Sequence, residues 1–139
     1  MPVAVLIGTG DAEHRPEGLG AWGPRVSGDH SIDIFIDAER ADRTLANLRD
    51  NGRIAVTLAY PISYRSVQFK GRIREIAAPT EEEREAVQKH REAFVVVTSL
   101  IGDPPETIRA LWLEDVIRLT VDIEAAFDQT PGPLAGRPL

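Results

Sequence analysis

The strongest constraint on the fold is one long stretch, near the C-terminal end, in which apolar and polar residues alternate. From Ile117 to Phe127 every second residue is apolar, whereas Arg118, Asp122 and Glu124 are among the residues between them. Because side chains along a strand point alternately to its two faces, this pattern predicts a half-buried β-strand. Its apolar face has to be covered by other parts of the chain, so further strands or helices must surround it.

Five shorter stretches complete the predicted set of strands. The alternation is clearest where Ile32, Ile34 and Ile36 share one face, and it is weakest where Gly23 and Pro24 interrupt the pattern. The shorter predicted strands cover residues 3–7, 19–26, 31–37, 54–60 and 67–76.

Helical spacing is confined to three segments. The predicted helices cover residues 41–50, 80–97 and 104–111. Asn51-Gly52 supplies a stop signal for the first helix, and Thr80 with Glu83 forms a capping box at the start of the second. Asp103 is the expected N-cap of the third. The apolar stripe expected along the second helix consists of Ala86, His90, Ala93, Phe94 and Val97.

The order of these elements indicates the fold class. Strands follow one another without alternating helices, which disfavours a parallel doubly wound sheet. Consecutive antiparallel strands with few helices favour a mainly β structure closed into a small barrel. The 139 residues are enough for one domain, so we predict a single domain over residues 1–139, with an irregular tail at residues 129–139 that holds three prolines and two glycines.

Composition excludes several classes of function. The chain has no cysteine, so it has neither disulfides nor thiolate chemistry. Its net charge of −6 disfavours nucleic acid as a partner. We expect no metal site, because the three histidines are far apart without a matching carboxylate pattern. No signal peptide or membrane span is expected, so we predict a cytoplasmic protein.

Three local features have competing interpretations. Arg72 and Arg74 share a strand face with Gln68 and Lys70. This basic strip either holds a phosphate or is a solvated face paired with acidic residues of a neighbouring strand. The glycine-rich residues 8–11 lack the lysine of a nucleotide-binding loop, so a hairpin loop is the expected structure there. The aromatic side chains stack on a planar ligand or fill the core, and for Trp112 we expect the core.

Residues 32–76 resemble the pyridoxamine 5′-phosphate oxidase-like proteins, the FMN-binding split β-barrel family. Residues 47–53 follow a pattern like N-L-x-x-N-x-R at the end of a short helix, and residues 71–75 follow a G-x-x-x-E pattern at the end of a strand. The resemblance implies a six-stranded antiparallel split β-barrel and a two-fold homodimer. It also implies FMN in clefts at the dimer interface, each drawing residues from both chains.

The resemblance also implies site residues. Arg43 and Thr44 fall on the basic pair that grips the flavin phosphate, although lysine is usual at the second position. Arg65 and Ser66 fall on the strand that enters Gly71, where glutamine is common in place of the serine. We therefore predict cofactor contacts from Arg43, Thr44, Arg65 and Ser66. Because Asp37, Glu39 and Asp42 surround the phosphate position, the predicted binding is modest and salt-sensitive.

The implied function is that of an FMN-binding flavoprotein, an oxidoreductase acting on a small organic substrate. The alternative is a split-barrel protein that binds deazaflavin, haem or another ligand and has no catalysis of its own. The resemblance identifies no catalytic residue and names no substrate or electron donor.

Overall fold

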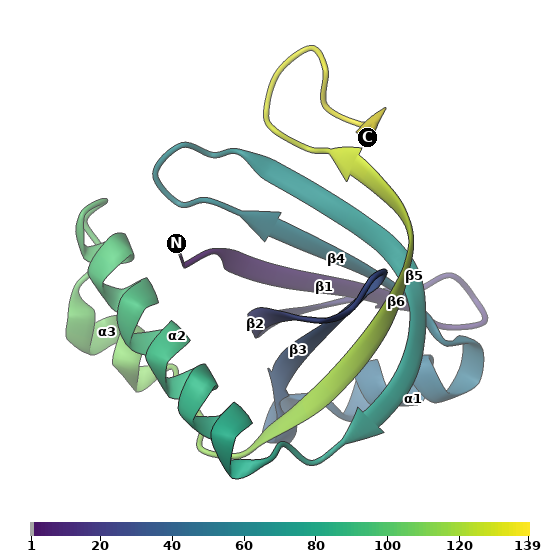
Figure 1. Cartoon of the computed structure of the whole chain (residues 1–139), viewed down its shortest axis with the longest axis horizontal. Coiled ribbons are helices and arrows are strands. Elements are labelled where there is room, and N and C mark those ends of the chain that lie inside the picture. Colours follow the sequence, from purple (N-terminus) through teal and green to yellow (C-terminus); the bar gives the residue numbers. More distant parts are fainter. Residues whose placement is uncertain (1) are drawn as a thin grey trace.

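Strands β1 to β6 form a closed antiparallel barrel in the computed structural model, which describes residues 2–139 (Figure 1). The strands pair in the order β3-β2-β1-β4-β5-β6, and β6 pairs back with β3 to close the barrel. This confirms the predicted six-stranded antiparallel barrel. The strands are β1 Ala4–Gly10, β2 Pro16–Gly28, β3 Ser31–Asp37, β4 Arg53–Ala59, β5 Ser66–Ala77 and β6 Val116–Asp128.

The barrel interior is filled by the apolar positions of the alternating pattern. Ile32, Ile34 and Ile36 of β3 are buried together, and Leu119 and Val121 of β6 lie in the same core. The register explains this arrangement, because Ile32 is opposite Val121 and Ile34 is opposite Leu119 where β3 and β6 close the barrel. The two strands with the clearest alternation therefore meet at the closure.

The β1–β2 hairpin differs from the sequence-based expectation. Gly8 and Gly10 belong to β1 and pair with β2, and the loop covers residues 11–15. The prediction of a hairpin loop at residues 8–11 was therefore placed too early. The Asp11 carboxylate sets the actual turn, because it accepts hydrogen bonds from the backbone N–H groups of Glu13 and Arg15 at 2.9 Å each. β2 is also longer than predicted, because its pairing with β3 continues past an irregularity between Trp22 and Arg25.

One end of the barrel is covered by α1, Asp42–Asn51, which follows the short 3₁₀ helix η1, Ala38–Arg40. Leu45 and Leu48 reach the barrel core, as their spacing predicted. Gly52 ends the helix in the left-handed conformation with φ of 69°, which confirms the predicted stop.

The long helix α2, Glu81–Ser99, packs against the outside of the barrel. Its capping box is confirmed, since Thr80 accepts from the Glu83 N–H and Glu83 accepts from the Thr80 N–H. The predicted apolar stripe was wrong in register. The most buried positions of α2 are Glu83, Val87, Arg91, Val95 and Thr98. The pattern misled because two of these positions are charged and become buried only through ion pairs with other elements.

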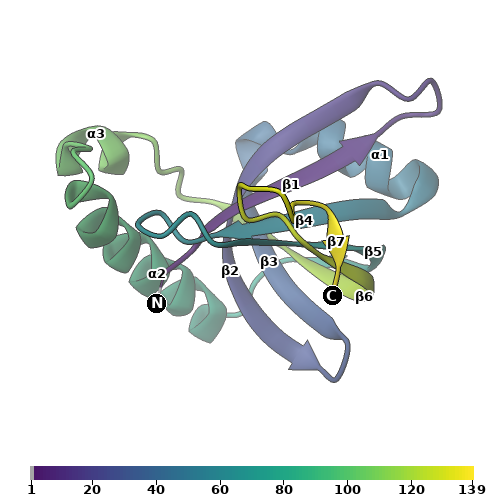
Figure 2. The same cartoon turned by 90° about the horizontal axis from the view of Figure 1, so that it is seen from above.

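A second, smaller apolar cluster holds α2 in place. It contains Phe35 of β3, Val87 of α2 and Val116 of β6, with Trp22 packed beside them. Phe35 therefore points away from the barrel core, opposite to its isoleucine neighbours, and packs against α2 instead. Figure 2 shows α2 and α3 together on one side of the barrel and α1 on the other.

The last elements are short. Helix α3, Pro105–Ala110, has Pro104 as its N-cap, so the prediction of Asp103 was wrong. The N–H of Asp103 instead donates to the carbonyl of Thr98 at the end of α2. The tail folds back on β6 through the two-residue strand β7, Arg137–Pro138, and is otherwise irregular as expected. Within residues 2–139 none of the helices has the length and apolar character needed to cross a membrane.

Candidate functional site

The four predicted cofactor residues lie in two separate places. Arg43 and Thr44 are in the first turn of α1, whereas Arg65 and Ser66 are at the turn that joins β4 to β5. Figures 1 and 2 both place α1 and this turn at opposite ends of the molecule. A single chain therefore does not bring the two pairs together.

Of the two α1 residues predicted to contact the flavin phosphate, Arg43 and Thr44, only Arg43 is exposed to solvent. The Arg43 side chain is 76% exposed and forms an ion pair with Glu17 of β2, with Nη1 to Oε2 at 3.2 Å. Thr44 is buried, with 1% exposure. Among residues 2–139 no side chain caps the start of α1, so none of these side chains satisfies the N–H groups of its first turn. An anion at this position would meet both these groups and the guanidinium.

An apolar cleft of about 260 Å³ lies between the β1–β2 pair and α2, and Arg40 of η1, just before α1, lies at its edge. Leu6 and Gly20 of adjacent strands contribute to its lining, as do Phe94 of α2 and Leu111, the residue that follows α3. Its basic residue is Arg40 of η1, whose Nη1 lies 3.7 Å from Oδ2 of Asp37. The cleft thus combines an apolar surface with a cation that precedes α1 by two residues, a combination suited to a flat organic ligand bearing an anionic group.

Arg65 and Ser66 line a second cavity of about 310 Å³ between the β4–β5 turn and the tail. The Ser66 N–H donates to the Thr130 hydroxyl at 3.1 Å, and the Ser66 hydroxyl donates to the Tyr64 carbonyl at 3.0 Å. Hydrogen bonds from Thr130 lower the pKa of Asp128 in this cavity, and the charges of Arg137 and Arg65 lower it further. Asp128 therefore carries a negative charge that offsets the charge of Arg65.

The basic strip on β5 is paired with acidic residues of the neighbouring strand. Arg74 Nε donates to Asp122 of β6 at 3.1 Å, and Arg72 Nε lies 3.7 Å from a carboxylate oxygen of Glu124. The interpretation of Arg72 and Arg74 as a solvated, ion-paired face is confirmed.

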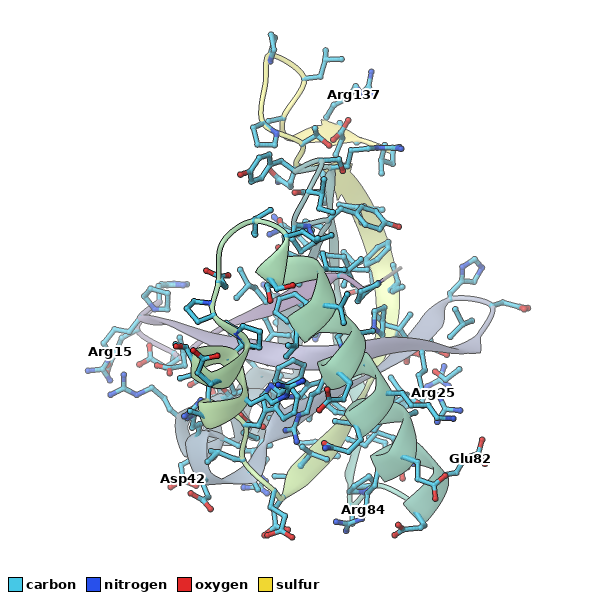
Figure 3. The ribbon with its side chains drawn as sticks, turned by 90° about the vertical axis from the view of Figure 1, so that its left-hand side faces the viewer. Arg15, Arg25, Asp42, Glu82, Arg84 and Arg137 are labelled. Carbon is cyan, nitrogen blue, oxygen red and sulfur yellow. The ribbon has the colours of Figure 1, made fainter. Side chains whose placement is uncertain are left out.

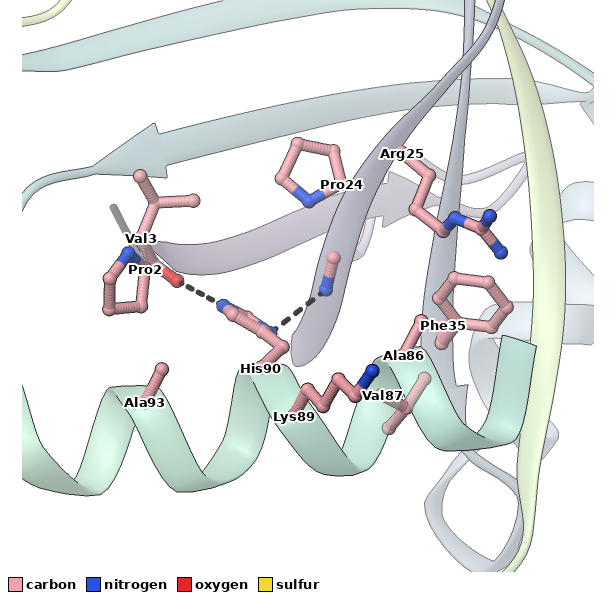
Figure 4. A pocket seen from close by; sticks show the side chains of 11 residues that line it. Pro2, Val3, Pro24, Arg25, Phe35, Ala86, Val87, Lys89, His90 and Ala93 are labelled. Carbon is pink, nitrogen blue, oxygen red and sulfur yellow. Dashed lines mark hydrogen bonds between the residues drawn. The ribbon is translucent and has the colours of Figure 1, made fainter. Parts of the chain in front are cut away.

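The histidine nearest to a cavity is held by the backbone on both sides. His90 of α2 lines a pocket of about 360 Å³ between α2 and the β2–β3 pair, and Figure 4 shows its ring between two backbone groups. Its Nδ1 accepts from the Gly23 N–H and its Nε2 donates to the Val3 carbonyl, both at 3.1 Å. Burial lowers the pKa of His90, so the neutral ring is favoured. With both nitrogens occupied, His90 holds α2 to the barrel and is unsuited to proton transfer.

Among residues 2–139, no group of three or more histidine, aspartate or glutamate side chains is placed to hold a metal ion.

Comparison with known proteins relates this fold to solved structures. No family model and no curated protein matches the chain. HupZ from Group A Streptococcus matches with a TM-score of 0.56 and 18% identity, over 96% of this chain and 90% of that one. A relative of general stress protein 26 from Clostridium acetobutylicum, described as of the pyridoxinephosphate oxidase family, matches with a TM-score of 0.57 and 16% identity, over 92% and 80%.

The descriptions of two further matches name a cofactor. An FMN-binding protein from Syntrophomonas wolfei matches with a TM-score of 0.50 and 16% identity, over 89% of this chain and 75% of that one. An F420 reductase matches with a TM-score of 0.53 and 13% identity, over 90% and 89%. The chain has the split β-barrel fold of the pyridoxamine 5′-phosphate oxidase-like proteins. At these identities the likeness establishes the fold, and the split barrel by itself assigns no ligand.

Sequence reasoning missed one residue of the split barrel's candidate site. Arg40 shares the cleft with Leu6 and Phe94, but these residues come from separate elements, and no spacing in the sequence connects them. The available signal was the position of Arg40 three residues before Arg43, at the entry to the same helix.

Proposed function

We propose that the protein binds FMN and acts as a flavoprotein that transfers hydride or electrons between the flavin and a small organic substrate. The observation that carries the proposal is the shared split-barrel fold, because proteins with this fold and high coverage of the chain are described as FMN-binding. The chain's own residues add the exposed Arg43 at an uncapped helix start and the neighbouring apolar cleft.

In this proposal the start of α1 holds the flavin phosphate. Arg43 supplies a guanidinium, and the free N–H groups of the first turn supply hydrogen bonds and the positive end of the helix dipole. Arg40 adds a second cation at the edge of the cleft. Glu17 is the present partner of Arg43, so phosphate binding exchanges one carboxylate for another anion. Thr44 is buried and contributes by supporting the first turn.

A two-fold homodimer accounts for the separation of the predicted residues. If each site is formed by two copies, Arg43 of one protomer and Arg65 with Ser66 of its partner belong to the same site. The exposed apolar side chains Leu6 and Ile62, at 58% and 51%, are then available for burial between copies. Light scattering at micromolar concentration tests this model, which predicts twice the chain mass of 15.3 kDa. A monomer mass contradicts it.

Flavin, when bound, supplies the redox chemistry, and the chain supplies binding and orientation. The apolar walls of the cleft exclude water from one face of a flat ring, and Arg40 and Arg43 place the anionic end. His90 is engaged at both nitrogens, so the proposal assigns it no proton transfer.

Titration of the apo protein with FMN, followed by quenching of flavin fluorescence, tests the proposal. Removal of the charge-assisted contact in Arg43→Ala is expected to weaken binding about ten- to hundredfold. Arg49→Ala is the matched control, because Arg49 is an exposed arginine in the last turn of the same helix. Absence of binding by the wild type overturns the flavoprotein proposal. Equal binding by wild type and Arg43→Ala overturns only the phosphate site.

The second candidate is a binding protein for a deazaflavin, and the F420 reductase among the structural matches favours it. F420 is a deazaflavin whose side chain also carries a phosphate group, so the same cations at α1 would serve it. Parallel titrations with FMN, F420 and haem separate these ligands. Saturable binding of F420 or haem, together with a failure to bind FMN, favours this second candidate.

A further inference from the structure

A pocket of about 520 Å³ lies between α2, α3 and the segment that leads into β6. Figure 3 faces this side of the molecule, with α2 and α3 next to each other and Arg84 near the first turn of α2. It shares no lining residue with the apolar cleft that contains Arg40. The apolar part of its lining consists of Val87, Trp112, Leu113 and Val116.

The pocket collects positive charge in a chain that is acidic overall. Arg84 and Arg91 come from α2 and Arg109 from α3, whereas Glu114 is the one acidic residue of the lining. Arg84 is exposed and forms no ion pair among residues 2–139. Arg109 pairs with Glu92 at 3.1 Å, but both side chains are half exposed, and an exposed pair of this kind is readily exchanged for another anion.

Two buried hydrogen-bond donors on residues of this pocket have no acceptor within the part of the chain that the structure describes. They are Nε of Arg91 and the indole Nε1 of Trp112. Arg91 is 4% exposed, and its other nitrogens donate to Asp37 and Gln88 at 3.0 and 3.2 Å. Buried donors in folded proteins are nearly always satisfied. Both donors belong to residues that line this one basic pocket.

We propose that this pocket binds a small organic molecule that carries a carboxylate or phosphate group on a flat apolar body. The oxygens of the anion meet Arg84 and Arg109, whose guanidinium groups are suited to bidentate contact with either group. The apolar body lies against Trp112 and Leu113. The site is independent of the proposed flavin site.

Isothermal titration calorimetry of the full chain with phenyl phosphate and with benzoate tests the proposal. Saturable binding of at least one probe is expected, with a dissociation constant below about 10 mM. Arg84→Ala and Arg109→Ala are each expected to weaken that binding about ten- to hundredfold. Comparison of the two probes shows whether phosphate or carboxylate is preferred.

Two control variants separate this pocket from other cationic positions. Arg53→Ala and Arg49→Ala each remove an exposed arginine that does not line this pocket, one from β4 and one from the last turn of α1; both are expected to leave probe affinity unchanged. Failure of both probes to bind overturns the proposal. A loss in Arg49→Ala or Arg53→Ala equal to that in Arg84→Ala also overturns it, because the probe then binds elsewhere or through general charge attraction.

Discussion

Arg91 of α2 donates a hydrogen bond from Nη2 to Oδ1 of Asp37, 3.0 Å away at the end of β3. Both side chains are more than nine-tenths buried, and the guanidinium also lies 4.9 Å from the centre of the Trp22 ring. This pair joins the long helix to the strand that closes the barrel. It also joins the two proposed sites, because Asp37 lines the apolar cleft that contains Arg40 and Arg91 lines the pocket between α2 and α3.

Arg91→Met is expected to lower the free energy of unfolding by up to about 3–5 kcal/mol, because it leaves the buried Asp37 carboxylate with only the half-exposed Arg40, 3.7 Å away, as a cation. Urea denaturation measures the change. Arg109→Met is the control, since its ion pair with Glu92 is exposed and is worth at most about 1 kcal/mol. The double variant Arg91→Met/Asp37→Leu should recover part of the loss. A cost for Arg91→Met no larger than that of Arg109→Met would contradict this role.

Stability is expected to depend on the protonation of His90. Burial holds its pKa in the folded protein below the ordinary value of 6.5, and the nearby charge of Arg91 lowers it further. The unfolded chain therefore takes up the proton first as pH falls. The contribution of neutral His90 is complete above pH 6.5 and is lost progressively below it. Unfolding free energies of wild type and His90→Phe, compared between about pH 7.5 and 5.5, measure this slope. Parallel curves for the two proteins would disprove it.

Gly71→Ala is expected to destabilise the barrel by about 1–3 kcal/mol through overpacking. A Cβ at this position would overlap the carbonyl oxygen of Asp122, where β5 and β6 come together at an irregularity in their pairing. Gly8→Ala is the matched control, because nothing lies near the Cβ position on that strand, and its effect should stay within about 0.5 kcal/mol. Thermal unfolding of both variants checks the difference, and equal melting temperatures would refute the close approach.

Glu17→Gln is expected to strengthen FMN binding by a few-fold. Glu17 holds Arg43 in an ion pair, and removing its charge frees the guanidinium for the phosphate and lowers the local negative potential. Fluorescence titration at low salt measures the affinity. Glu13→Gln is the control, because Glu13 pairs with Arg15 on the same hairpin. Equal changes in FMN affinity for Glu17→Gln and Glu13→Gln would contradict a specific role of Glu17, because the affinity would then depend only on the net charge of the chain.

The strands, the end of α1 and the start of α2 were predictable because their signals are local. The alternation in β6 and the three isoleucines of β3 identified the core faces correctly, since a strand has a fixed two-residue period. The Thr80–Glu83 capping box and Gly52 marked helix ends for a similar reason: each involves residues within one turn. The barrel as a fold followed from the order of these elements together with the family resemblance.

The candidate site was only partly predictable. Arg43 was identified by its place before the N-L-x-x-N-x-R pattern, whereas Arg40 and the cleft were missed because the lining comes from five different elements and the residue after α3. The buried face of α2 was misplaced because Glu83 and Arg91 look like surface residues in a sequence. Their burial depends on Arg118 and Asp37, which are 35 and 54 residues away along the chain.

The sequence by itself determined which segments are strands and helices and which strand faces are apolar, because those properties depend on neighbours within a few residues. Only the tertiary structure decided which charges meet. The Arg91–Asp37 pair, the matching of Arg72 and Arg74 with β6, and the unpaired Arg84 all depend on distances between separate elements. The sequence around a charged residue looks the same whether its side chain faces solvent or a buried carboxylate. The role of that side chain is therefore set by the folded arrangement around it.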